Sequence, residues 1–160
     1  MRKSTVGFIN FTALPDSPPD AAPQSKITPG YHFEELCDGR VLAYTIRSIE
    51  WEALKPAFDH LRQPVEAWPE DRPFLIMMDM TDPSLVFTPR IRQEVDEIIK
   101  MISGRQGRIA TVMVQSILLQ VARLYTSLRP LKKMQQRILF NRGEALSWLM
   151  EAYEISFWKD

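Results

Sequence analysis

The sequence has little of the chemistry that small folded proteins use for covalent or metal-based stabilisation. It contains one cysteine, Cys37, and two histidines, His32 and His60. One cysteine excludes an intramolecular disulfide and a cysteine-based zinc site, and two histidines are too few for a histidine-rich metal cage. We therefore expect no cofactor and no metal, and we expect a cytoplasmic location.

Long apolar runs and an excess of one charge are also missing. The longest apolar stretches, such as residues 74–78 and 117–119, are far shorter than the roughly 20 residues that cross a bilayer. Arg2 and Lys3 are not followed by a continuous apolar core, so neither a secretory signal nor a transmembrane segment is expected. Twenty Lys and Arg balance twenty Asp and Glu, which argues against specific nucleic-acid binding by the surface as a whole.

The sequence does contain enough apolar material for one domain. Of its 160 residues, 45% are hydrophobic and 10% are aromatic. Residues 1–29 are rich in proline and are expected to form an N-terminal tail, in which residues 6–14 are apolar enough to dock. Residues 30–160 are expected to form the domain. Ile155, Phe157 and Trp158 add a second apolar terminus, and the two together suggest a homodimer contact.

Local patterns in the first half predict a hairpin followed by a helix. An Asp-Gly pair at 38–39 separates two β-prone runs, 31–36 and 41–46, and such a pair is typical of a hairpin turn with positive φ. Apolar residues at helical spacing then predict a helix that begins near Glu50 and ends at Pro64.

The remaining elements alternate between strand and helix. The nearly continuous apolar run 74–80 is typical of a buried central strand. It is followed by a helix from Thr88-Pro89, a strand at 109–114, a helix after Ser116, a strand at 138–140 and a helix that contains Trp148. The expected order is β-β-α-β-α-β-α-β-α. This order predicts a single α/β domain with a mixed, mostly parallel sheet and right-handed crossovers.

The C-terminal half contains a strand at 108–112, an amphipathic helix with Ala122 and Arg123, and an ending in which Phe140 precedes Glu-Ala-x-x-Trp-Leu at 144–149. Together these segments resemble the SpoIIAA-like branch of the STAS domain family. The resemblance implies a STAS-like fold and a non-catalytic regulatory or protein-interaction role. The wider family includes antagonists of anti-sigma factors, regulatory domains of anion transporters and lipid-binding relatives.

The resemblance also implies a role for the loop after the central strand. In phospho-regulated members of the family, an Asp-Ser-Ser-Gly-like turn carries the modified serine at this place. Asp79 keeps its position here, but Thr81 stands where a serine is expected and the glycine is absent. Thr81 or Ser84 is then a phosphorylation candidate, although Asp79 and Asp82 would repel a phosphate. An ordinary loop that leads to a helix cap is the alternative.

Two features of the chain predict where a ligand would bind. In an open α/β sheet, ligands lie outside the carboxyl ends of the strands, where Asp79, Thr81, Gln115 and Ser116 are expected to converge. The interior is also rich in methionine. We expect these side chains to pack in the core, and an adaptable core of this kind can also hold a fatty acyl chain. They are Met77, Met78, Met80, Met101 and Met113.

The charges of the neutral chain are unevenly distributed, because no acidic residue occurs from 98 to 143. Six basic residues in this interval surround the third crossover and are expected to form one positive surface, with a solvated connector as the alternative. They are Arg123, Arg129, Lys132, Lys133, Arg137 and Arg142. Such a surface would bind an acidic protein partner or an anionic ligand.

The few reactive side chains form no catalytic pair. His32 and Cys37 lie an odd number of residues apart on one predicted strand, so they face opposite sides of the sheet. We expect Cys37 to be a small buried residue and His60 to be solvated near a helix end. No catalytic residue is assigned. The predicted function is therefore a regulatory or protein-interaction domain. The alternative is a carrier or sensor of an anionic lipid or a nucleotide-like molecule, which requires an interior pocket of about 300 Å³ or more.

Overall fold

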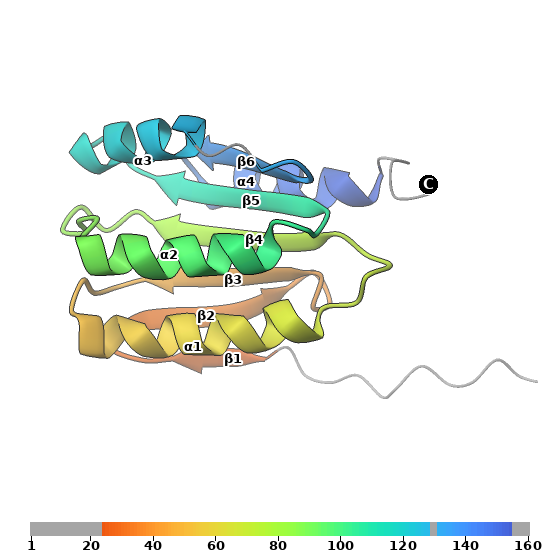
Figure 1. Cartoon of the computed structure of the whole chain (residues 1–160), viewed down its shortest axis with the longest axis horizontal. Coiled ribbons are helices and arrows are strands. Elements are labelled where there is room, and N and C mark those ends of the chain that lie inside the picture. Colours follow the sequence, from red (N-terminus) through yellow and green to blue (C-terminus); the bar gives the residue numbers. More distant parts are fainter. Residues whose placement is uncertain (1–23, 129–130, 155–160) are drawn as a thin grey trace, which may run out of the picture.

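The predicted alternation of strands and helices becomes one six-stranded sheet in the computed structural model, which describes residues 24–128 and 131–154. Its strands are β1 (Ser25–Ile27), β2 (Tyr31–Leu36), β3 (Val41–Ile46), β4 (Phe74–Met80), β5 (Gly107–Met113) and β6 (Met134–Leu139). They lie side by side in chain order (Figure 1). β1 to β3 pair antiparallel, and β3 to β6 pair parallel. The predicted α/β class with a mixed, mostly parallel sheet is confirmed.

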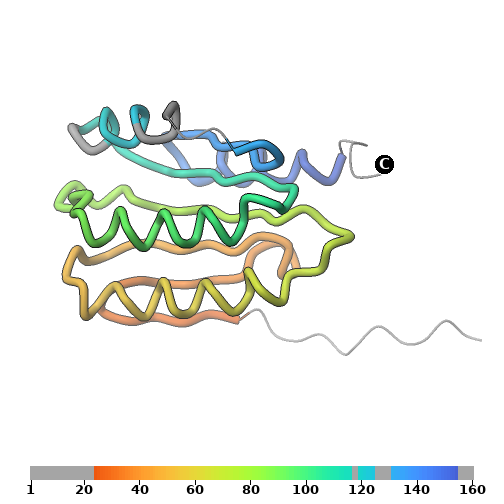
Figure 2. The backbone as a smooth tube through the Cα atoms, viewed as in Figure 1, coloured from red at the N-terminus to blue at the C-terminus, as the bar shows by residue number. Residues whose placement is uncertain are grey.

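Helices cover both faces of this sheet. They are α1 (Trp51–Ala67), α2 (Pro89–Ile102), α3 (Ile117–Leu128) and α4 (Arg142–Met150), and a single 3₁₀ turn (Glu151–Tyr153) follows α4. Because successive parallel strands are neighbours and crossovers have one hand, α1, α2 and α3 lie on the same face. The backbone trace in Figure 2 shows this layer in front of the sheet and α4 behind it.

The central strand β4 separates two hydrophobic cores. Its alternate residues point to opposite faces, so Phe74 and Ile76 pack under α1 and α2, whereas Leu75 and Met77 pack under α4. Leu75 and Phe74 are almost completely inaccessible to solvent. The expectation that residues 74–80 form a central strand is thereby confirmed.

The opening hairpin follows the prediction from the Asp-Gly pair. Asp38 and Gly39 have φ values of 56° and 73°, and the amide of Arg40 donates to the Cys37 carbonyl oxygen at 3.2 Å. Cys37 differs from the expectation, because it is half-buried in the turn with a φ of 54° rather than a buried residue of a strand. The turn, and not a packed core, fixes its position.

The end of α1 and the start of β6 differ from those predicted, whereas the start of α2 does not. α1 continues through Pro64 to Ala67, because the buried side chain of Val65 extends the apolar stripe of Leu54 and Leu61 beyond the proline. β6 begins at Met134 rather than at residue 138, because the polar run 135–137 carries no apolar strand signal although it pairs with β5. The predicted capping of α2 is confirmed, as the Thr88 hydroxyl accepts from the Ile91 amide at 3.3 Å.

The sheet also begins earlier than the boundary expected at residue 30. β1 lies in the stretch assigned to the tail and pairs antiparallel with β2, and the Glu35 amide donates to the Gln24 carbonyl oxygen at 3.0 Å. An edge strand pairs on one side only, so a short run between prolines suffices. The residues expected to dock, 6–14 and 155–158, lie outside the described residues.

Candidate functional site

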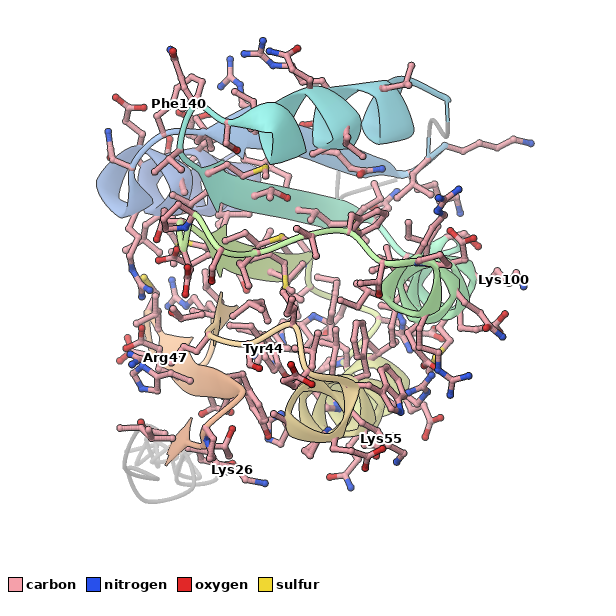
Figure 3. All side chains as sticks on the ribbon, turned by 90° about the vertical axis from the view of Figure 1, so that its left-hand side faces the viewer. Lys26, Tyr44, Arg47, Lys55, Lys100 and Phe140 are labelled. Atoms are coloured by element: carbon pink, nitrogen blue, oxygen red, sulfur yellow. The ribbon has the colours of Figure 1, made fainter. Side chains whose placement is uncertain are left out.

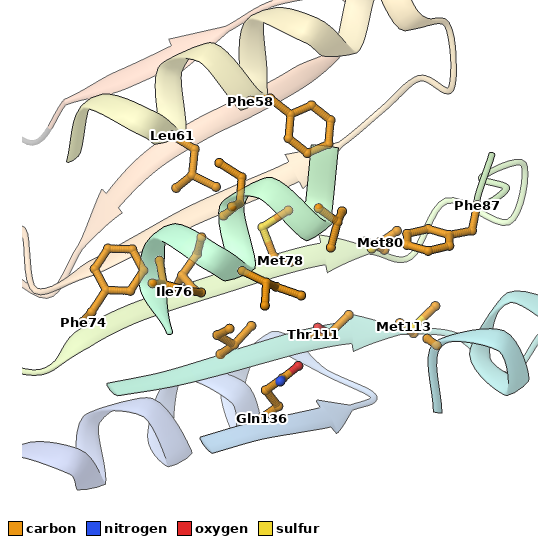
Figure 4. Close-up of a pocket in the computed structure, with 16 residues that line it drawn as sticks. Phe58, Leu61, Phe74, Ile76, Met78, Met80, Phe87, Thr111, Met113 and Gln136 are labelled. Carbon is orange, nitrogen blue, oxygen red and sulfur yellow. The ribbon is translucent and has the colours of Figure 1, made fainter. Parts of the chain in front are cut away.

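An apolar pocket lies between α2, α3 and the inner face of β4, β5 and β6 (Figure 4). Its volume is about 150 Å³. α1 closes one side with Phe58 and Leu61, and Met78, Met80 and Met113 belong to its lining. Because Met78 and Met80 are only half-buried, the pocket is open to solvent. Three of the five methionines expected in the core therefore also form a surface that a ligand can reach.

The pocket arises from unequal packing among the three helices on this face. Arg62 of α1 and Glu94 of α2 form an ion pair with an N···O distance of 2.7 Å, and the two helices run closely together. α3 has few close backbone approaches to α2. A gap is left beside α3, and Ala122 is too small to fill it.

Two polar side chains interrupt the apolar lining, and neither was predicted from the sequence. Thr111 of β5 and Gln136 of β6 lie on the inner face of the sheet and reach the pocket (Figure 4). A signal for Gln136 was its position two residues after Met134 and two before Ile138. It shares a face with Met134 and Ile138, so it is a polar residue on the side of the strand that faces a helix.

Two of the four residues predicted at the carboxyl edge, Asp79 and Thr81, lie in one polar network. One carboxylate oxygen of Asp79 accepts from the hydroxyl and amide of Thr81 at 2.8 and 3.2 Å, and the other lies 3.2 Å from Nη1 of Arg142. Arg142 also donates to Thr45 at 3.1 Å and forms an ion pair with Glu34. Asp79, which is 6% exposed, thus has the partners that a buried carboxylate needs. This network connects β2, β3 and β4 to the start of α4.

The other candidates near this edge take local roles. The Ser116 hydroxyl accepts from the Leu119 amide at 3.4 Å, and Gln115 is exposed. Within the described residues, no hydrogen bond joins either side chain to Asp79 or Thr81. The Ser84 hydroxyl and amide both donate to Asp82, and these hydrogen bonds lower the pKa of the Asp82 carboxyl.

The predicted basic residues do not form one surface. Arg123 lies on α3, whereas Arg137 stacks on Trp148 of α4, on the opposite face of the sheet, with 5.7 Å between guanidinium carbon and ring centre. Arg142 is engaged by Asp79 and Glu34. Lys132 and Lys133 are exposed beside the start of β6, and Arg129 lies outside the described residues. The sheet separates charges that are close in sequence.

His60 is not the solvated residue that the sequence predicted. It lies inside α1, and its Nδ1 atom is 2.8 Å from the Tyr44 hydroxyl. Figure 3 shows Tyr44 beside this helix. The ring centre of His60 is 4.4 Å from that of Phe33. Burial, and to a smaller extent Lys26, lowers the pKa of His60, while Glu35 opposes this shift. The continuation of α1 through Pro64 explains the error, because it places His60 in the middle of the helix.

This environment predicts a pH dependence of stability. Since the folded protein disfavours protonated His60, the unfolded chain binds more protons below its ordinary pKa of 6.5. The free energy of unfolding should therefore fall as the pH decreases from about 6.5 to the lower pKa of the folded state, and level off below it. We expect His60→Asn, whose amide group can replace Nδ1 as the hydrogen-bond partner of Tyr44, to remove this component from urea unfolding curves. His32→Asn should keep it; identical pH profiles for native protein and His60→Asn would contradict the prediction.

Comparisons with known proteins add little to this geometry. No protein-family model matches the chain, and no curated protein matches it. Within the described ranges, no helix combines the length and apolarity that crossing a membrane requires, and no three His, Cys, Asp or Glu side chains are grouped to hold a metal ion. Among solved structures, the chain is similar to an uncharacterized protein of the DUF3478 family with a SpoIIAA-like fold from Shewanella loihica PV-4. The two are 13% identical, with a TM-score of 0.49, over 80% of this chain and 92% of that one.

Proposed function

We propose that the protein is a binding domain that carries or senses a small, mostly apolar molecule in the pocket beside α3. The observation that supports this proposal is an open apolar pocket at a place where a sheet and its helices would otherwise form a continuous core. A cavity of about 150 Å³ accepts a ligand of the size of benzene. The pocket is smaller than the roughly 300 Å³ expected for a carrier of an anionic lipid or a nucleotide-like molecule, so the ligand is a single ring or a short acyl chain.

The lining also favours a neutral ligand over the anionic one that the sequence suggested. Thr111 and Gln136 provide hydrogen-bond donors and acceptors without charge. None of the described residues that line the pocket is Lys, Arg, Asp or Glu. A ligand with one hydroxyl or amide group and an apolar body satisfies both polar side chains and the methionine-rich walls.

A protein-interaction role is a second candidate, favoured by a separate surface. Lys132 and Lys133 are exposed and border a hollow of about 270 Å³ near the start of β6. Leu131 and Gln106 also line this hollow. Two lysines form a much smaller positive surface than six basic residues would, so the apolar pocket is the better-supported site.

The pocket can be tested with 1-hexanol as a probe of matching size. We expect calorimetry to show saturable binding of 1-hexanol to the native chain. Ala122→Phe should abolish it, because a phenyl ring added from α3 is of the size that such a cavity holds. Val121→Phe is the matched control, since Val121 is 43% exposed on the same helix and does not line the pocket. Thr111→Val, which removes the hydroxyl and keeps the shape, should weaken binding.

Two results would contradict this proposal. One is equal binding of 1-hexanol by the native chain and Ala122→Phe; the other is its absence from the native chain. Circular dichroism of Ala122→Phe shows whether the variant is folded, and Thr111→Val tests the site without adding volume. Native mass spectrometry of the purified full chain would also reveal any ligand that it retains, together with the oligomeric state.

A further inference from the structure

A separate cluster of polar side chains lies at the opposite edge of the sheet from Asp79, where the parallel strands begin. The turn between β2 and β3 carries Arg40, the loop between α1 and β4 carries Arg72, and the 3₁₀ turn after α4 carries Tyr153. The guanidinium carbon of Arg40 is 5.3 Å from the centre of the Tyr153 ring. That of Arg72 is 4.5 Å from the centre of the Trp68 ring.

Two polar atoms in this cluster are buried and have no hydrogen-bond partner among the residues that the structure describes. They are Nε of Arg72 and the hydroxyl of Tyr153. Neither Arg40 nor Arg72 forms an ion pair within those residues. Buried polar groups almost always have a partner in the protein, a bound water or an ion. The N–H of Arg72 and the O–H of Tyr153 can each donate a hydrogen bond to an acceptor oxygen.

The electrostatics of Tyr153 show which charges face it. Burial raises the pKa of its hydroxyl, whereas Arg72 and, to a smaller extent, Arg40 act to lower it. Asp71 and Cys37 act in the raising direction. Arg40 contacts the Tyr153 ring, and the connection that carries Arg72 lies at the same edge of the sheet (Figure 1). Asp71 is the acid whose charge opposes those of the two arginines.

We propose that Arg40, Arg72 and Tyr153 bind a small oxyanion of the phosphate or carboxylate type. Such an anion supplies acceptor oxygens to three donor groups, and a guanidinium group binds two of these oxygens at once. The position of the Arg72 side chain is fixed before an anion binds, because it stacks on Trp68. The indole N–H of Trp68 in turn donates to the Pro73 carbonyl oxygen at 3.1 Å. Arg40 is exposed, so its guanidinium can turn from the Tyr153 ring toward the anion.

Calorimetric titration of the full chain with inorganic phosphate, at constant ionic strength set with chloride, tests the proposal. We expect saturable binding that Arg72→Gln weakens at least tenfold and Tyr153→Phe weakens by a smaller factor. Asp71→Asn should tighten binding, because it removes the opposing charge. Arg92→Gln is the matched control, since Arg92 is an exposed arginine on α2. A parallel titration with acetate distinguishes a phosphate site from a carboxylate site.

Loss of structure cannot imitate this pattern, because one variant gains affinity. The proposal is overturned if neither anion binds the native chain saturably, if Arg92→Gln weakens binding as much as Arg72→Gln does, or if Asp71→Asn fails to tighten it. The site is also independent of the apolar pocket. Ala122→Phe should leave phosphate binding unchanged, so failure of one proposal is distinguishable from failure of the other.

Discussion

Replacement of Trp148 by alanine is expected to lower the free energy of unfolding by about 3 to 5 kcal/mol, the range observed for large aromatic residues in well-packed cores. Trp148 is 9% exposed and packs with Leu75 and Met77 between α4 and the sheet. The surrounding side chains cannot collapse freely into the space, because strand pairing fixes β4 and β5 on both sides. A cavity therefore remains where the indole was.

The stability lost in Trp148→Ala comes from packing alone, because the hydrogen bonds of the neighbouring Arg108 do not depend on the indole ring. This buried arginine stacks on the indole at 4.9 Å, but its hydrogen bonds go to the Trp148 carbonyl oxygen, the Gln135 side chain and the Glu151 carboxylate. All three acceptors remain in Trp148→Ala, so no buried charge loses its partners. Urea unfolding followed by circular dichroism would measure the change. Ser147→Ala changes an exposed neighbour and should stay within about 0.5 kcal/mol of the native protein. If Trp148→Ala were as stable as the native protein, the indole would not anchor α4.

A single methyl group at Gly30 is expected to have the second-largest effect. A Cβ atom there would lie 1.8 Å from the carbonyl oxygen of Ala53 in the first turn of α1. Neither backbone can yield easily, because the Gly30 carbonyl accepts from the Arg47 amide at 2.9 Å and Ala53 is fixed in the helix. We expect Gly30→Ala to cost about 3 kcal/mol, the upper end of the usual range for overpacking.

Gly104→Ala is the matched control for this substitution. An added Cβ at Gly104 meets no atom within 4 Å, so the same chemical change should be neutral or stabilise the protein by about 0.4 to 1 kcal/mol. Midpoints and slopes of urea unfolding measure both variants. Equal stabilities for Gly30→Ala and Gly104→Ala would mean that α1 can move away from the β1–β2 connection without cost.

The sequence by itself determined the elements whose signals are local. The Asp-Gly pair placed the hairpin turn, because few other residues tolerate two successive positive φ values. Thr88 and Pro89 marked the start of α2, since one supplies a capping oxygen and the other has no amide hydrogen to satisfy. The apolar run 74–80 identified the central strand, because only a strand buried on both faces can be apolar on both.

Predictions from single residues were wrong where tertiary packing outweighs local preference. A proline disfavours the interior of a helix, yet Pro64 lies within α1, because the stripe that includes Val65 continues to pack on the sheet. The early end predicted for α1 also misplaced His60, which contacts Phe33 and Tyr44 instead of solvent. β1 was missed because three residues carry no periodicity, and their strand character comes only from pairing with β2.

The tertiary structure alone decided which side chains share a site. Arg137 and Arg142 are near Lys132 in sequence, but they do not share a surface with it. Arg137 points to the face of the sheet that α4 covers, because side chains alternate along β6, and Arg142 lies in α4 itself. The apolar pocket exists because α3 stands apart from α2, and spacing between helices depends on the packing of all their side chains together. Arg40, Arg72 and Tyr153 come from three distant connections, and only the folding of the sheet brings these connections to one edge.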